Sequence, residues 1–173
     1  FIKYIITMKY LVLAIVLFIS SHGFGQSDVE KQNKQGKDTA VSNPQYDKEL
    51  ALKLGADDYG MKSYFFVMLK KGNNTTTDKN FINTCFKGHM ENIKRLVDEK
   101  KLIVAGPFAK NDADFRGIFI IHKVKSAEEV KELLQKDDAI KNGILDYDIY
   151  TWYGSAALPE YLPFSDKIWK KEP

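Results

Sequence analysis

The chain has few residues on which chemistry could be built. Its 173 residues include one cysteine and three histidines. The single cysteine, Cys85, excludes an intrachain disulfide, so the core has to hold the fold. Helix-borne metal ligands need i, i+4 partners or converging carboxylates, so His89 and His122 alone do not make a metal site. We expect no metal and no cofactor.

The sequence also lacks a block of basic residues. It has 26 lysines and arginines against 23 acidic residues, and the first 25 residues contain Lys3, Lys9 and no acid. The rest of the chain is therefore nearly neutral. This balance gives little electrostatic attraction to a phosphate backbone, and we expect no nucleic-acid partner.

No uninterrupted apolar run reaches the roughly 20 residues that a membrane-spanning helix needs. The run at residues 10–19 follows a lysine and leads into small residues, a pattern typical of a secretory signal peptide. We predict a signal peptide over residues 1–25, with Met8 as an alternative start and cleavage near Gly25/Gln26. The product would be secreted or periplasmic, with no stable membrane span. An uncleaved anchor is the alternative.

Residues 26–60 are polar and poor in aromatic side chains. Such a stretch buries too little apolar surface to offset its ordering entropy, so we predict a largely disordered linker with one short helix within residues 46–54. The folded domain is placed at residues 61–154. Residues 155–173, which carry prolines and aromatic side chains, are expected to pack on this domain as a tail.

Hydrophobic patterning predicts four strands and two helices in the domain. The strands fall at residues 63–69, 102–108, 117–124 and 144–152. The first helix spans residues 83–101, and the second begins after Ser126, where Glu129 completes a capping box. A break is expected at residues 137–143.

The first of these helices carries apolar residues at the spacing of one helical turn, and we expect this stripe to face the core. The stripe consists of Phe86, Met90, Ile93 and Val97. His89 lies about 50 degrees from its centre, at about 100 degrees per residue, which places it at the edge of the expected buried face.

The order of elements is typical of a ferredoxin-like α+β fold, βαββαβ, with a four-stranded antiparallel sheet and two helices on one face. The strands carry large apolar residues on both faces, among them Phe65, Phe66 and Ile121. A sheet that is apolar on both faces needs a second layer. We expect a second copy to supply it, giving a homodimer through the open sheet face that pairs as a dimeric α/β barrel.

Three motifs then occur together: His89 in the first helix, Gly106 and Pro107 after the second strand, and the run at residues 137–143 after the second helix. In this combination residues 64–152 resemble the YCII-related (YciI-like) proteins. The resemblance covers about half of the chain. Any one of these motifs alone would be weak.

This resemblance implies a dimeric α+β barrel with a small pocket between helices and sheet. The histidine and aspartate suspected to be active in the family fall on His89 and Asp137. Most members have no established activity, and a few related proteins are thought to be dehydrochlorinases or lactone-processing enzymes acting on hydroxylated aromatic compounds. One departure puts the aim of Asp137 in question: the family commonly has Asp-Pro where this chain has Asp137 and Asp138.

A histidine oriented by a carboxylate can act as a general base. In this hypothesis Asp137 bonds one ring nitrogen of His89 and the other nitrogen faces a small substrate. The reaction class is proton abstraction or elimination, as in a cofactorless lyase or isomerase. Two alternatives stay open: His89 is a boundary histidine bonded to a loop carbonyl, or the domain is a non-enzymatic dimeric module that binds a small molecule in the cell envelope.

The remaining chemistry-bearing residues each have a functional and a structural interpretation. Cys85 is a nucleophile or a half-buried small hydrophobe, and His122 is a ligand or part of the dimer rim. The others either line a site or belong to solvated loops and packed surfaces. They are Asp112, Asp114, Arg116, Asp146, Asp148, Tyr147, Tyr150, Trp152 and Tyr153.

Overall fold

The computed structural model of the chain describes residues 43–165 and 167–170. The predicted signal peptide, its cleavage site and residues 26–42 of the predicted linker lie outside these residues. One compact unit, Pro44–Pro173, contains all the described helices and strands. Within the described part of the chain, no helix has the length and apolar character needed to cross a membrane.

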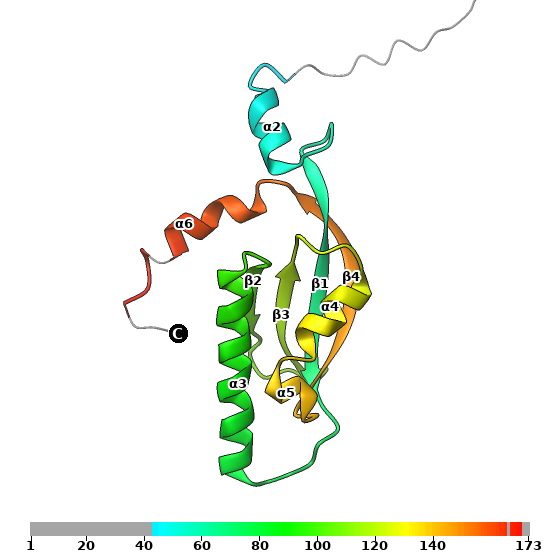
Figure 1. Cartoon of the computed structure of the whole chain (residues 1–173), viewed down its shortest axis with the longest axis vertical. Helices are drawn as coiled ribbons and strands as arrows, with labels where there is room; N and C mark the ends of the chain where they lie inside the picture. The colour runs from blue at the N-terminus through cyan, green and yellow to red at the C-terminus, as the bar shows by residue number, and fades with distance from the viewer. Residues whose placement is uncertain (1–42, 166, 171–173) are drawn as a thin grey trace, which may run out of the picture. The chain divides into compact units, whose positions relative to one another are not determined.

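Four strands and two longer helices make up most of this unit (Figure 1). The strands are β1 (Met61–Lys71), β2 (Leu102–Pro107), β3 (Phe115–Ile121) and β4 (Leu145–Ser155). The longer helices are α3 (Lys79–Asp98) and α4 (Ala127–Leu134). The short helices are α2 (Lys48–Leu54), α5 (Asp138–Lys141), η1 (Leu158–Tyr161) and α6 (Leu162–Ser165).

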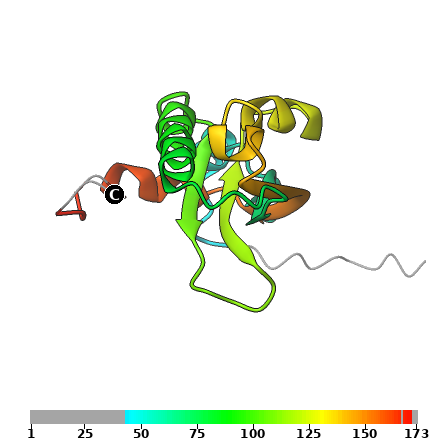
Figure 2. The ribbon, with the colours of Figure 1, turned by 90° about the horizontal axis from the view of Figure 1, so that it is seen from below.

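The strands form one antiparallel sheet in the order β2-β3-β1-β4. The helices α3, α4 and α5 all lie on one side of this sheet (Figure 2). This arrangement is the ferredoxin-like α+β fold, because the strand order and the helix-covered face both match it. The predicted fold class of the single chain is therefore confirmed, and the pairing of two copies stays a prediction.

β1 lies inside the sheet and is apolar on both faces. Val67 points toward the helices and pairs with Phe119 of β3 and Ile149 of β4. Since side chains alternate along a strand, residues of the same parity on β1 share this face. The core between sheet and helices consists of Val67, Leu69, Cys85, Leu96, Leu102, Phe119, Ile121, Val130, Leu133, Leu134, Ala139, Ile140 and Leu145.

The opposite face of the sheet carries a second, smaller apolar cluster. Its buried members are Tyr64, Ile103 and Ile120, and Leu158 of η1 packs against them. The hydroxyl of Tyr161, at the end of η1, donates a hydrogen bond to the carbonyl of Ile103. The chain's own segment after β4 therefore covers one part of this face.

Both longer helices begin at a side chain that accepts backbone N–H groups. Ser126 Oγ accepts from the N–H of Glu129 at 3.2 Å, as the capping box predicts. Asp78 Oδ1 accepts from the N–H groups of Asn80 at 2.9 Å and Phe81 at 3.3 Å. Because Asp78 caps it, α3 begins before the predicted residue 83.

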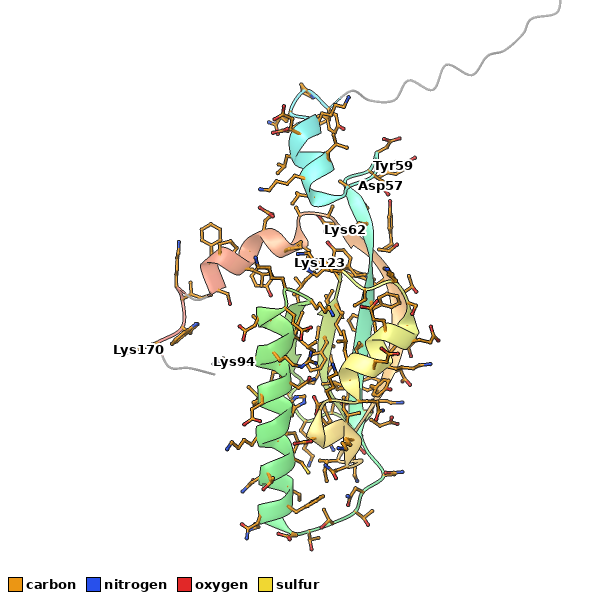
Figure 3. All side chains as sticks on the ribbon, viewed as in Figure 1. Asp57, Tyr59, Lys62, Lys94, Lys123 and Lys170 are labelled. Carbon is orange, nitrogen blue, oxygen red and sulfur yellow. The ribbon has the colours of Figure 1, made fainter. Side chains whose placement is uncertain are left out.

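The N-terminal part of the unit is joined to the sheet by polar contacts. α2 falls within the range expected for a short helix, and none of its residues is buried. Lys62 Nζ donates to the carbonyl of Leu54 at 2.9 Å, and the hydroxyl of Tyr153 donates to the carboxylate of Asp57. Figure 3 shows Asp57 and Lys62 close together where β1 begins.

The predicted orientation of α3 is wrong. Of the expected stripe, Phe86, Met90 and Val97 are 40%, 45% and 46% exposed, and Ile93 is only partly buried. The physical reason is that the inward face is selected by α5, which presents a buried carboxylate to polar groups of α3. The buried residues of α3 are Cys85, Gly88, His89, Asn92 and Leu96.

The predicted break at residues 137–143 contains the one-turn helix α5. Asp137 caps this helix, and Gly143, which follows it, has a φ of +70°. A single turn has no apolar periodicity to reveal it. α5 lies against α3 at Gly88, where an added Cβ would come within 2.2 Å of Asp138 Oδ2 and 2.7 Å of its Cβ.

Substitution Gly88→Ala should destabilise the domain by about 1–3 kcal/mol, because the new methyl group forces α5 away from α3. This cost would exceed the gain of about 1 kcal/mol that alanine normally gives over glycine inside a helix. Chemical denaturation measures the change. Gly106→Ala is the control, since a Cβ there meets nothing within 4 Å. A Gly88→Ala protein as stable as wild type would contradict this account of the contact.

Candidate functional site

His89 and Asp137 are in direct contact on the helix-covered side of the sheet. His89 Nδ1 lies 2.6 Å from Asp137 Oδ2, and the two residues are 8% and 0% exposed. The predicted pair is thus brought together across 48 positions of sequence. The sequence leaves open that His89 bonds a loop carbonyl. In the structure its hydrogen bond goes instead to the carboxylate of Asp137.

The carboxylate of Asp137 is surrounded by donors. Oδ1 accepts the N–H groups of Ala139 at 3.0 Å and Ile140 at 3.3 Å, and Oδ2 accepts from His89 and, at 3.5 Å, from Asn92 Nδ2. A buried carboxylate is costly without such partners. The turn without the family's proline therefore still holds Asp137 in place, since the cap on α5 orients it.

Aromatic rings contact the imidazole on two sides. The ring of Phe119 stacks on His89 with centroids 5.8 Å apart and planes at 20°. Phe86 meets it edge-on, with centroids 6.0 Å apart and planes at 85°. These contacts, together with the bond to Asp137, hold the ring in one orientation.

Nε2 is the ring nitrogen that remains open. Within the described residues His89 has one hydrogen bond, at Nδ1, and no buried side-chain nitrogen or oxygen lacks a partner. Nε2 therefore reaches the surface of the protomer. Because a carboxylate only accepts, Nδ1 carries the hydrogen of the neutral ring, and the lone pair lies on Nε2. Such a nitrogen can take a proton from a bound molecule.

Cys85 lies one turn before His89 on the same buried face of α3. Burial is the first cause that raises the pKa of its thiol, and the nearby charge of Asp138 adds to it. A thiol with a raised pKa is a poor nucleophile at neutral pH. Cys85 is thus a core residue, in line with its structural interpretation.

His122 is held by the backbone. Its Nε2 lies 2.8 Å from the carbonyl of Lys100, and its ring lies against Tyr64. Burial lowers the pKa of His122, and the charges of Lys62 and Lys123, which lie toward the same end of the sheet in Figure 3, lower it further. The structure does not bring His122 and His89 together in one hydrogen-bonded group.

Three of the other acidic candidates, Asp114, Asp146 and Asp148, belong to ion pairs. Asp114, an exposed residue of the loop before β3, accepts at 3.0 Å from Nη2 of Arg116, which lies in β3 and is partly buried. On the face of the sheet away from the helices, Lys70 Nζ lies 2.8 Å from Asp148 and 3.9 Å from Asp146. The hydrogen bond to Asp148 is the first cause that raises the pKa of Lys70.

The aromatic candidates on β4 have separate surroundings. Tyr147 packs against the main core, and Trp152 contacts Tyr64 with centroids 5.5 Å apart. Tyr150 is exposed, and Tyr153 bonds Asp57, which raises the pKa of its hydroxyl to about 12. Asp112 is an exposed loop residue. Within the described part of the chain, no group of three histidine, cysteine or acidic residues could hold a metal ion.

Sequence reasoning missed Asn92 and Arg95. Asn92 is buried on α3 and contacts Asp137, and Arg95 Nη2 donates to Asn92 Oδ1 at 2.7 Å. A signal was present in the spacing along α3, since His89, Asn92 and Leu96 recur at intervals of three and four positions and share a helix face. The apolar stripe beside them concealed it.

The fold and this buried pair define a small ferredoxin-like α+β domain with a histidine–carboxylate site. The family model for the YCII-related domain matches residues 64–153, which is more than half of the chain and includes both members of the pair. The chain therefore belongs to the YCII-related domain family.

The comparison with solved structures finds 5-chloro-2-hydroxyhydroquinone dehydrochlorinase (TftG) from Burkholderia phenoliruptrix AC1100, in complex with 2,5-dihydroxybenzoquinone. The two chains share 22% sequence identity, and the TM-score is 0.37. The similarity covers 51% of this chain and 92% of the other. No curated protein matches the chain.

Substitution Asp137→Ala should lower the free energy of unfolding by about 2–4 kcal/mol, because it removes the cap of α5 and leaves buried donors unpaired. The matched control is Asp78→Ala, which removes a cap with the same two-bond geometry at an exposed site. It should cost about 1 kcal/mol. Equal losses in denaturant titrations would show that burial of the Asp137 carboxylate adds nothing.

Proposed function

We propose that the chain is an exported, cofactorless enzyme of the lyase or isomerase type, with His89 as general base and Asp137 as its orienting partner. The observation that carries the proposal is the 2.6 Å contact at Nδ1, which leaves Nε2 open at the surface of the protomer. The substrate class is a small hydroxylated aromatic compound or lactone, as the family resemblance suggests.

The chemistry is a proton transfer. Nε2 takes a proton from a carbon or hydroxyl group of the substrate, and the electron pair of the broken bond forms a new double bond. In an elimination the leaving group departs with its own electron pair, and Nε2–H then gives its proton to that group or to water. In an isomerisation an existing double bond of the substrate shifts, and Nε2–H returns the proton at another atom. Asp137 stabilises the imidazolium that forms in between, since its carboxylate accepts the hydrogen on Nδ1.

The second candidate function is a non-enzymatic module that binds a small molecule. The rings of Phe86 and Phe119 beside His89 favour it, because aromatic walls with one polar group are typical of small-molecule sites. Both functions use the same residues. They differ in whether a proton moves.

A thermal-shift screen with catechol, hydroquinone and γ-butyrolactone should identify a compound that raises the Tm of the chain by about 3 °C at concentrations well above its Kd. The shift should be lost in His89→Gln and kept in His122→Gln, since His122 is bound to backbone elsewhere. A compound that stabilises the wild type and both variants equally would show that His89 takes no part in binding it.

Proton NMR in deuterium oxide then separates the two functions. An enzyme should exchange a carbon-bound acidic proton of the bound compound for deuterium faster than buffer does, and His89→Gln should abolish the excess rate. Binding without exchange or turnover would support the non-enzymatic module.

We also propose that the chain is a homodimer through the open sheet face. Since Val67 points toward the helices, its neighbours Phe66 and Met68 point to the other face, where both are only partly buried. Leu158 covers the cluster around Tyr64, and no described helix covers the remainder of this face. A second copy would bury these side chains.

Light scattering on the full chain should give twice the mass of one chain, and Met68→Glu should give a monomer because it places a charge in the interface. Met90→Glu is the matched control, since Met90 is 45% exposed on α3. A monomeric wild type would contradict the dimer, and dissociation by Met90→Glu alone would move the interface to α3.

A further inference from the structure

We infer that Asn92 and Arg95 are positioning residues of the His89–Asp137 pair, and that they couple it to the charge of Glu99 at the surface. The inference rests on the proposed function only in one respect: the contacts affect catalysis only if His89 is a general base. Its geometry is that of a continuous chain of polar contacts along one side of α3.

The amide of Asn92 can have only one orientation in this chain of contacts. Its Oδ1 accepts from Arg95 Nη2 at 2.7 Å, and its Nδ2 lies 3.5 Å from Asp137 Oδ2. A guanidinium can only donate, and a carboxylate can only accept. Rotating the amide by half a turn would bring donors against donors and acceptors against acceptors. Asn92 is therefore held between a cation and an anion.

Burial makes this orientation matter. Asn92 is 4% exposed, so neither end of its amide can exchange its partner freely for water. Asn92 and His89 donate to the same oxygen, Oδ2 of Asp137. The position of that oxygen decides where the imidazole points, and the Asn92 amide restricts it from the side of α3.

Arg95 extends the chain of contacts to solvent. Its Nη1 donates to Glu99 Oε1 at 2.6 Å, and the two side chains are 29% and 38% exposed. The hydrogen bond from Arg95 is the first cause that lowers the pKa of Glu99. Lys101 Nζ also lies 3.4 Å from Glu99. The positive charge nearest to Asn92 is thus partly neutralised by a surface carboxylate.

Few other charged groups surround the pair. From α5, the side chain of Asp138 lies against Gly88, next to His89. On α3, Cys85 is the remaining titratable residue of the buried face. β3 presents the uncharged ring of Phe119. Arg95 and Glu99 are therefore the two charges whose removal tests the coupling without disturbing a fully buried group.

Removing the charge of Arg95 and removing the charge of Glu99 should change proton binding by the His89 ring in opposite directions. Without the positive charge of Arg95, the Asp137 carboxylate holds the imidazolium more strongly, so the ring should keep its proton to higher pH. Without the negative charge of Glu99, Arg95 is no longer neutralised and its charge disfavours the imidazolium. A merely structural role would loosen the site in both variants and give no such opposition.

The experiment is a pH titration of the His89 ring by ¹⁵N NMR on the full chain at about 0.15 M salt, where exposed charges are screened. The midpoint should rise by about 0.3–1 pH unit in Arg95→Met and fall by a similar amount in Glu99→Gln. Lys87→Met and Glu91→Gln form the matched control, because they are another i, i+4 pair on α3 with side chains 79% and 70% exposed. Both should leave the midpoint unchanged.

Shifts of the same sign, no shift in either variant, or equal shifts in the control pair would overturn the inference. The ring ¹⁵N shifts also report the tautomer, and in Arg95→Met the neutral ring should keep its hydrogen on Nδ1, because Asp137 Oδ2 still accepts it. No substrate is needed for these measurements. A failure of the coupling therefore leaves the proposed function standing, and an inactive protein with coupled titrations refutes only the function.

Discussion

Burial of the Asp137 carboxylate is the constraint on which the rest of the domain depends. A fully buried charge has to be matched by donors on both oxygens. Two of these donors are backbone N–H groups of α5, and two are side chains of α3, more than forty residues earlier in the chain. α3 and α5 must therefore meet closely at one level. Gly88 permits this, because no side chain would fit between the helix and Asp138.

The same constraint explains why α3 presents polar residues inward. Apolar burial alone would favour the stripe of Phe86, Met90 and Val97, which is the larger hydrophobic surface. The stripe nevertheless remains partly exposed, because turning it inward would remove His89 and Asn92 from the carboxylate. A buried charge without partners costs more than several half-exposed apolar side chains. The polar contact therefore selects the helix face.

Because partners for the buried charge outweigh burial of the apolar stripe, only part of the structure could be predicted from the sequence. Apolar runs of strand length and the Ser126 capping box are local signals, and the four strands, α4 and the fold class followed from them. The face of α3 could not follow, since it depends on a carboxylate 48 positions away. α5 is one turn long and carries no periodicity. The pairing of His89 with Asp137 came from the family resemblance, and Asn92, which has no part in that motif, was missed.

The two carboxylate oxygens of Asp137 have different roles, one in the fold and one at the candidate site. Oδ1 caps α5 and belongs to the fold, whereas Oδ2 orients His89 and belongs to the site. Any substitution of Asp137 disturbs both, so a loss of activity in such a variant says little about catalysis. His89 contacts only Oδ2. Arg95 acts on the carboxylate through Asn92 and does not contact Oδ1, which caps α5. Variants at His89 and Arg95 therefore separate what the carboxylate does for the reaction from what it does for the fold.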